Sequence, residues 1–150
     1  MSAAALIRPL DASDEAEWRR LWTAYLDFYG TSVSEEVYAT SFARMLSGEA
    51  DEFRGLIAEV DGRPVGLAHY LFHRHGWRIE NVCYLQDLYT DPAVRGTGVG
   101  RALIEAVYAA ADAEGCPNVY WTTQAFNRTA RQLYDRIGEE TPFIKYQRKT

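Results

Sequence analysis

The sequence predicts an α/β (α+β) fold in which a mixed β-sheet carries helices on its faces. Two observations lead to this class. Some segments repeat apolar residues every three or four positions, as amphipathic helices do, whereas others are short apolar runs bounded by turn residues, as strands are. Two strands joined by a tight turn precede a strand–helix–strand unit, so antiparallel and parallel pairs are expected in one sheet. The expected order is β-α-α-β-β-β-α-β-α-β.

The first third of the chain is expected to hold one strand and two helices. Residues 6–10 form a short apolar segment, and the proline within it favours an edge position in the sheet. The next helix starts at Ser13 or Asp14, carries an apolar stripe and ends at Gly30. Ser34 and the two glutamates after it predict a second helix, because a serine cap and acidic residues both favour a helix N-terminus.

The rest of the chain is expected to contain five strands and two helices. Residues 53–60 and 65–72 are apolar runs separated by Asp61 and Gly62, a dipeptide typical of a two-residue hairpin turn. The later elements alternate between strand and helix, and they are expected at residues 80–90, 99–113, 119–123, 129–137 and 143–146.

Length and composition indicate one domain over residues 1–150. The hydrophobic share of 47% suits a chain that buries a core, and no linker or repeat divides it. The net charge of −5 argues against a nucleic acid as the main partner. Cys83 and Cys116 form no paired motif, so neither a disulfide framework nor a metal site is expected. No membrane-length apolar run and no signal peptide are recognised, so we expect a cytoplasmic protein without a membrane partner.

The most specific motif is a glycine-rich segment between a predicted strand and a predicted helix. Residues 95–101 read Arg-Gly-Thr-Gly-Val-Gly-Arg. Glycines let backbone N–H groups approach a ligand closely, and a helix N-terminus adds partial positive charge, so this segment suits a phosphate or pyrophosphate. Arg101 and Ala102 stand where a P-loop needs lysine and a hydroxyl, and the third glycine of a dinucleotide fingerprint is missing. A turn that only caps the helix is the alternative.

A second motif follows the strand expected at residues 119–123. Asn127 precedes the next predicted helix, Tyr134 falls within that helix and Gly138 follows it. Taken singly, Asn127 is an ordinary helix cap or turn residue, and Tyr134 is an ordinary core aromatic. Their order and spacing after the glycine turn make coincidence a poor explanation.

Together the two motifs resemble the GNAT superfamily of N-acetyltransferases. Arg95, Gly98 and Gly100 match its Arg/Gln-x-x-Gly-x-Gly/Ala pattern, which cradles the pyrophosphate of acetyl-CoA. The resemblance implies a mostly antiparallel sheet of six to seven strands flanked by about four helices, with acetyl-CoA as cosubstrate. The residues that it implies for binding acetyl-CoA are Leu88, Tyr89, Thr90, Arg95, Gly96, Thr97, Gly98, Val99, Gly100, Arg101, Asn127, Ala130 and Tyr134.

Within the superfamily, the chain looks nearest to the spermidine/spermine acetyltransferases and related amine or amino-acid acetyltransferases. Residues 85–87 read Leu-Gln-Asp where the polyamine enzymes have Leu-Glu-Asp. The glutamate of those enzymes helps to bind the cationic acceptor, whereas Gln86 is neutral, so polyamine specificity does not follow. The side chains expected to line the acceptor site are Tyr25, Tyr29, Trp77, Tyr84 and Gln86.

The implied reaction is direct attack of a primary amine on the thioester of acetyl-CoA in a ternary complex. A backbone N–H near Leu88 would stabilise the negative charge that develops on the carbonyl oxygen. Tyr134 is the candidate acid for the leaving thiolate, since tyrosine ordinarily keeps its proton at neutral pH. Glu80 is the first candidate for the base that deprotonates the amine. The alternative bases are Asp87, His73 and His75.

Other functions remain open from the sequence. The acceptor is a small amine, a polyamine or an amino acid, and the alternative is a protein lysine or N-terminus. A non-catalytic acyl-CoA-binding module and a structural domain with an incidental glycine turn are further alternatives. The family resemblance and the strand expected at residues 143–146 favour a homodimer built partly from C-terminal strands.

Overall fold

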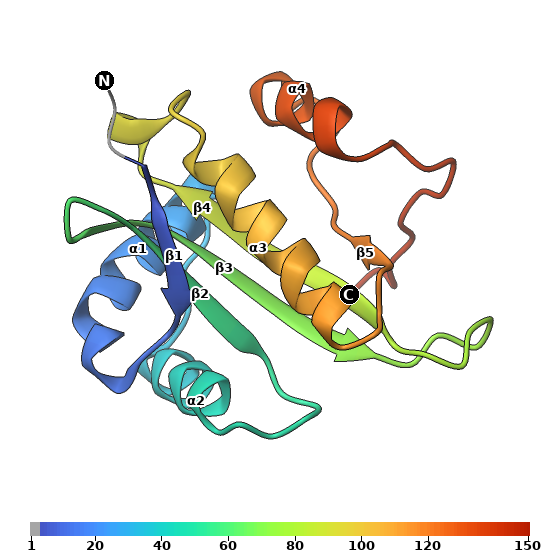
Figure 1. Ribbon diagram of the computed structural model, residues 1–150, viewed down its shortest axis with the longest axis horizontal. Helices are drawn as coiled ribbons and strands as arrows, with labels where there is room; N and C mark the ends of the chain where they lie inside the picture. Colours follow the sequence, from blue (N-terminus) through green and yellow to red (C-terminus); the bar gives the residue numbers. More distant parts are fainter. Residues whose placement is uncertain (1–3) are drawn as a thin grey trace.

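The computed structural model describes residues 4–150 (Figure 1). Its strands are β1 (Leu6–Pro9), β2 (Arg54–Val60), β3 (Arg63–His73), β4 (Val82–Thr90) and β5 (Val119–Tyr120). Its helices are α1 (Glu15–Phe28), α2 (Glu35–Leu46), α3 (Val99–Ala113) and α4 (Arg128–Ile137), with short 3₁₀ turns η1 (Ala12–Asp14) and η2 (Pro92–Val94). None of the described helices is both long enough and apolar enough to cross a membrane.

A single sheet with the strand order β1-β2-β3-β4-β5 forms the centre of the described molecule. Strands β1 to β4 pair in antiparallel fashion, and β5 joins β4 in parallel. Figure 1 shows α3 across one face of the sheet and α1 and α2 on the other. Leu103 and Val107 anchor the buried cluster under α3, and Trp18 and Leu21 anchor the cluster under α1 and α2. Both faces are therefore covered by helices, as the predicted fold class requires.

Local signals in the sequence account for several element boundaries. The hydroxyl of Ser34 accepts a hydrogen bond from the N–H of Val37 at the start of α2, which confirms the predicted cap. Helix α3 spans the predicted residues 99–113. Asp61 and Gly62 both have positive φ between β2 and β3, as a type I′ hairpin turn requires.

The start of α1 differs in detail from the prediction. Asp14 occupies the N-cap position of α1, but its side chain makes no capping hydrogen bond. Asp11 instead caps the preceding turn η1 by accepting a hydrogen bond from the N–H of Ser13 at 2.8 Å. The Asp14 carboxylate is occupied by the guanidinium of Arg8, with two contacts of 2.8 Å. The Asp14 side chain, which local sequence predicts as a helix cap, therefore forms an ion pair with Arg8 of β1 instead.

The described sheet has five strands, fewer than the six to seven expected. Strand β5 spans two residues instead of 119–123, and residues 143–146 form no strand. A strand needs the backbone of a neighbour to satisfy its N–H and C=O groups. The pairing of β5 with β4 ends at Tyr84 and Tyr120, so β5 offers later segments only two residues of regular strand to pair with.

A β-bulge at Gln86 shapes the part of β4 that faces the site. Leu85 pairs with Tyr70 and Asp87 pairs with His69, so Gln86 is an extra residue with no partner on β3. A bulge changes which face of the sheet the following side chains occupy. Leu85 therefore packs under α3, whereas Asp87 lies with His69 on the α1 side.

Candidate active site

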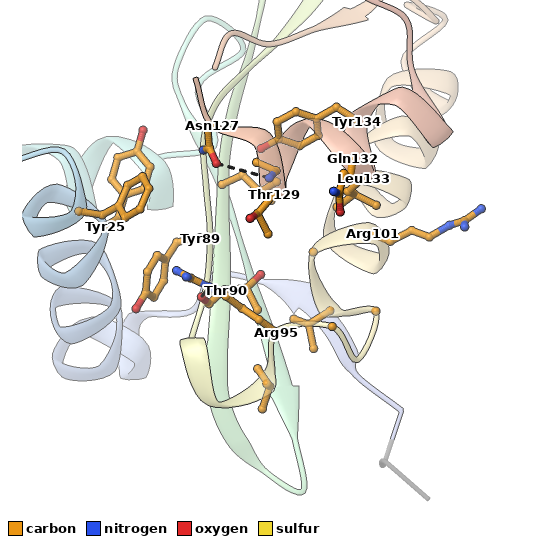
Figure 2. A pocket seen from close by; sticks show the side chains of 18 of the residues that line it. Tyr25, Tyr89, Thr90, Arg95, Arg101, Asn127, Thr129, Gln132, Leu133 and Tyr134 are labelled. Atoms are coloured by element: carbon orange, nitrogen blue, oxygen red, sulfur yellow. Dashed lines mark hydrogen bonds between the residues drawn. The ribbon is translucent and has the colours of Figure 1, made fainter. Parts of the chain in front are cut away.

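A cavity of about 650 Å³ lies where β4 has parted from β5 (Figure 2). Four segments line it: the end of α1, the last residues of β4, the glycine turn with the start of α3, and α4. Of the predicted acetyl-CoA-binding residues, all but Thr97 line this cavity. Tyr25 and Tyr29 from the predicted acceptor site line it as well. The structure thus brings together residues from both halves of the chain.

The glycine turn is open backbone at one end of the cavity. Gly96 and Gly98 have φ of +80° and +93°, values that favour glycine because a side chain would strain the backbone. A Cβ atom built on either glycine meets nothing within 4 Å, so the space beside both is free. Gly98 is also the N-cap residue of α3, whose first N–H groups have no partner within the helix. This end of the cavity is suited to an anionic phosphate group.

Three arginines make the cavity lining positively charged. Arg95, Arg101 and Arg136 line it, and none of the described lining residues is an aspartate or a glutamate. The Nε of Arg95 donates to the carbonyl oxygen of Thr90 at 3.2 Å, which holds the side chain beside β4. Arg101 pairs with Glu105 outside the cavity. The charges of Arg95 and Arg136, which form no ion pair with any described residue, add to that of the helix N-terminus and favour an anionic ligand.

The last residues of β4 carry unpaired backbone on their cavity side. Leu88, Tyr89 and Thr90 pair with β3 along one edge of β4. Their other edge has no strand partner, because the pairing of β4 with β5 ends at Tyr84. All three residues line the cavity, and successive residues of a strand direct their N–H and C=O groups to opposite edges. The groups on the cavity edge, apart from the Thr90 carbonyl that accepts from Arg95, can therefore bind a ligand that lies along the strand.

Helix α4 closes the opposite side of the cavity. The side chain of Asn127 accepts a hydrogen bond from the N–H of Ala130 at 3.4 Å and so caps α4 (Figure 2). Tyr134 lines the cavity from this helix, and its ring packs edge-on against Trp121. Burial and the neighbouring Tyr29 raise the pKa of Tyr134 to about 12. Its hydroxyl is therefore a proton donor at neutral pH.

Aromatic side chains from the end of α1 form the wall facing α4. The ring centroids of Tyr25 and Tyr29 are 5.1 Å apart, as are those of Phe28 and Tyr29. All three residues line the cavity. Burial, together with the nearby Asp87 carboxylate, raises the pKa of Tyr25 well above its ordinary value. This aromatic wall offers ring faces and hydroxyl groups to a second ligand beside the anion-binding end.

Five predicted residues, and the alternative bases Asp87, His73 and His75, do not line the cavity. Trp77 and Glu80 lie in the loop between β3 and β4, where Trp77 is 82% exposed and Glu80 lies 3.9 Å from Arg78. This loop extends beyond the end of the sheet, so the expectation that its residues face the site is not met. Tyr84 stacks on Tyr120 with centroids 4.8 Å apart. The other two are Gln86, exposed at the bulge, and Thr97, whose hydroxyl binds the carbonyl of Val94.

Several lining residues were not found from the sequence. Helix α4 contributes Thr129, Gln132, Leu133 and Arg136, which repeat every three or four positions and so share one face of the helix. Extending the helical period from Ala130 would have identified Leu133 alone. His69, which hydrogen-bonds Asp87 behind the aromatic wall, carried no signal in the linear sequence.

Comparison with known proteins identifies the class to which this site belongs. The sequence profile described as Acetyltransferase (GNAT) family matches residues 18–138. The chain therefore belongs to the GNAT family of acetyltransferases, which confirms the resemblance drawn from its motifs. It is an acyltransferase enzyme whose cosubstrate is acetyl-CoA. The open glycine turn and the arginine-lined end of the cavity fit the phosphates of that cosubstrate.

Two curated relatives cover nearly the whole chain. The D-amino-acid N-acetyltransferase HPA3 of Saccharomyces cerevisiae is 38% identical over 144 residues, covering 95% of this chain and 89% of its own. The thialysine N-epsilon-acetyltransferase of Mus musculus is 28% identical, covering 92% and 85%. Among solved structures, AAC(6')-Iy in complex with a CoA-based bisubstrate analogue superposes with a TM-score of 0.84 at 21% identity, covering 99% of both chains. That structure supports the fold.

Proposed function

We propose that this enzyme transfers the acetyl group of acetyl-CoA directly to the primary amine of a small molecule, such as an amino acid, a polyamine or another amine. The observation that carries the proposal is the single cavity with two different ends. The anion-binding turn lies at one end and the aromatic wall at the other, with Tyr134 on the helix opposite that wall. Two substrates bound in one cavity can react without leaving it.

Direct transfer in a ternary complex is supported by the chemistry of the lining. No cysteine, serine or histidine is among the described lining residues. The two cysteines are buried in the core, and burial raises the pKa of Cys83 to about 12. A thiol that holds its proton so tightly is a poor nucleophile. We therefore expect no acetylated enzyme intermediate.

Each part of the cavity has a proposed role in the reaction. The glycine turn and Arg95 bind the pyrophosphate, and Leu88–Thr90 pair with the amide-bearing arm of the cosubstrate. The backbone N–H at Leu88 stabilises the negative charge on the carbonyl oxygen as the neutral amine attacks. An ammonium acceptor first loses one proton to water. Tyr134 then donates its proton to the departing thiolate, and the proton that the attacking nitrogen gives up as the amide forms returns to the Tyr134 oxygen. Glu80 is not proposed as the base, because it lies outside the cavity.

The relatives support a small amine as the acceptor. The yeast relative is named for D-amino acids and the mouse relative for thialysine. An aminoglycoside N(6')-acetyltransferase of Klebsiella aerogenes is 27% identical over 92% of this chain and 91% of its own. Each of these names describes a small molecule with an amino group. A protein lysine or N-terminus is the second candidate.

The function is tested in two stages. Thermal unfolding is first followed with CoA and with acetyl-CoA, and a hundredfold excess over Kd should stabilise the folded state by about 2.7 kcal/mol. An acceptor panel of D-amino acids, thialysine, spermidine, an aminoglycoside and a lysine peptide is then assayed for release of free CoA thiol. Release with small amines supports the proposal, and release with the peptide alone favours a protein acetyltransferase. Binding without any release indicates an acyl-CoA-binding module.

A charge-matched pair of variants tests the site itself. Arg95→Gln should weaken acetyl-CoA binding, because it removes a cation from the anion-binding end of the cavity. Arg63→Gln changes the same residue type at the exposed start of β3, outside the cavity, and should leave binding unchanged. Equal affinities for the two variants in a titration would show that the phosphates bind elsewhere.

We also propose that two copies of the chain associate through their C-terminal segments. Residues 139–150 form neither helix nor strand. They carry Phe143, Ile144 and Tyr146, each more than 75% exposed. Exposed apolar residues in an extended segment favour pairing with a second chain. Light scattering should give twice the mass of the chain, and a monomeric mass at micromolar concentration contradicts the proposal.

A further inference from the structure

Three buried side chains form a chain of hydrogen bonds behind the aromatic wall of the cavity, next to the half-buried Tyr25. The indole Nε1 of Trp18 donates to His69 Nε2 at 2.9 Å, and His69 Nδ1 lies 2.8 Å from Asp87 Oδ2. Tyr25 lies on α1, the helix that also carries Trp18, and burial together with the Asp87 carboxylate raises its pKa. Trp18, His69 and Asp87 are 0%, 4% and 6% exposed. Tyr25, next to this chain, is a lining residue of the cavity.

The Trp18 contact determines where His69 carries its proton. An indole N–H can only donate a hydrogen bond, so His69 Nε2 must accept and cannot bear a proton. A neutral imidazole has one N–H, which is therefore at Nδ1 and donates to Asp87. A doubly protonated ring would direct its Nε2–H against the N–H of Trp18. His69 is therefore a neutral hydrogen-bond donor, and the Asp87 carboxylate is its acceptor.

The Asp87 carboxylate is consequently buried without a positive partner. In the described part of the chain, its one ion-pair candidate is His69, which the Trp18 contact keeps neutral. The other titratable groups around this cluster are the phenols of Tyr25, Tyr29, Tyr84, Tyr38 and Tyr89, none of which supplies a positive charge. Burying a carboxylate without a counter-charge is costly. A cationic ligand on the cavity side of Tyr25 would offset that cost.

We infer that His69, held in one neutral tautomer by Trp18, is a positioning residue that presents the Asp87 carboxylate to Tyr25 and, through this pair, to an acceptor that arrives as an ammonium ion. The inference rests on the proposed amine acetylation and specifies the charge of its substrate. The bulge at Gln86 makes the arrangement possible, because it brings Asp87 to the same face as His69. An acceptor without a positive charge would lack this contact.

The first experiment observes the tautomer in the unmodified chain. Long-range ¹H–¹⁵N spectra of the imidazole groups distinguish a protonated from an unprotonated ring nitrogen. We expect His69 to show a protonated Nδ1 and an unprotonated Nε2 at neutral pH. His73 and His75 provide internal comparison signals from the same spectra. A protonated Nε2 on His69 at neutral pH would overturn the inference without any kinetic assay.

Two tryptophan variants separate positioning from packing. Trp18→Phe removes the N–H that keeps His69 neutral. Trp22→Phe is the matched control, since Trp22 stacks on Trp18 at 5.2 Å and its Nε1 has no hydrogen-bond partner in the described structure. Both variants lose similar core volume. In Trp18→Phe, His69 can become an imidazolium that neutralises Asp87, so the KM for the amine should rise as pH falls, relative to Trp22→Phe. Identical pH profiles for the two variants would refute the role of His69.

The third experiment tests the charge of Asp87. Asp87→Asn should raise the KM for a cationic acceptor by about thirtyfold or more, the change typical of losing one partner of a buried charge pair. The stabilisation by acetyl-CoA should not change. If no amine in the panel is acetylated, n-butylammonium is titrated with CoA present while the His69 signals are followed. Shifts in the unmodified chain that are absent in Asp87→Asn support the inference even though the proposed reaction has failed. No shift in either chain refutes it.

Discussion

At the scale of single residues, the site depends on side chains whose chemistry burial has changed. Tyr134 is the clearest case. Its sequence position indicated a possible acid, and a pKa of about 12 shows that its surroundings hold the proton firmly. The cause is burial beside Tyr29 and Trp121, which no inspection of the linear sequence could supply.

Removal of the Tyr134 hydroxyl tests this residue directly. Tyr134→Phe should lower kcat by about a hundredfold, because general acid catalysis typically contributes that much or more. Acetyl-CoA should still stabilise the variant as it does the unmodified chain. In the unmodified enzyme, raising the pH should lower kcat through loss of this proton only when the pH comes within about one unit of the Tyr134 pKa of about 12. An unchanged kcat in the variant would leave Tyr134 with a packing role alone.

The Arg8 ion cluster gives a prediction about acid stability. Arg8 contacts Asp14 at 2.8 Å and Glu59 at 2.7 Å, and the hydrogen bond from Arg8 lowers the pKa of Asp14 below its ordinary 3.8. A lowered carboxyl pKa stabilises the fold above about pH 4 and ceases to do so as pH falls through the folded value. Arg8→Met should therefore reduce the free energy of unfolding by about 2 kcal/mol at neutral pH.

The same free energy difference should begin to shrink near pH 4 and be lost as pH falls through the lowered pKa of Asp14 in the folded chain. Urea unfolding at several pH values measures it. Arg44→Met is the control, because Arg44 is more than half exposed and lies 3.9 Å from Glu52. If the Arg8 variant and the control lose equal stability at every pH, the ion cluster does not contribute as described.

At the scale of elements, two glycines at the start of α3 differ in whether their backbone conformation requires glycine. Gly98 has φ of +93°, a conformation that costs other residues about 1–2 kcal/mol. A Cβ on Gly100 would make ordinary contacts of 3.5 Å with Leu133 and Thr90. Gly98→Ala should lower both the urea midpoint and acetyl-CoA affinity, whereas Gly100→Ala should retain both. Equal losses in the two variants would show that backbone conformation is not the deciding factor.

A close approach between β3 and β4 allows a second test at this scale. A Cβ on Gly66 would lie 2.8 Å from the carbonyl oxygen of Tyr89, on the segment of β4 that lines the cavity. Because backbone must move to relieve this contact, Gly66→Ala should cost about 1–3 kcal/mol of stability and weaken acetyl-CoA binding. Gly76→Ala meets nothing within 4 Å and should change neither quantity in the same titration and unfolding experiments.

At the scale of the whole molecule, the described chain leaves an exposed apolar segment next to a short edge strand. The proposed dimer would cover the exposed rings of Phe143 and Tyr146. Replacing both with serine should shift the light-scattering mass from dimer to monomer. Far-ultraviolet circular dichroism should stay nearly constant, because residues 139–150 hold no helix or strand. A dimeric mass in the variant would move the interface to another surface.

The local part of the prediction proved accurate because its signals lie within a few adjacent residues. The hairpin turn at Asp61 and Gly62, the Ser34 cap and the bounds of α3 each follow from backbone conformation or capping within a single turn. The strand expected at residues 143–146 was wrong for a single chain, since a strand depends on a partner that local sequence cannot specify.

By itself the sequence determined the family and the place of the glycine turn proposed to bind the phosphates, since both reside in contiguous motifs such as Arg95, Gly98 and Gly100. Only the tertiary structure decided which side chains share the cavity. Glu80 follows the strand pattern yet lies outside it, whereas His69 and Asp87 meet because one unpaired residue alters the register of β4. Register and burial arise from contacts between residues distant in the chain, and the pattern of neighbouring residues does not encode those contacts.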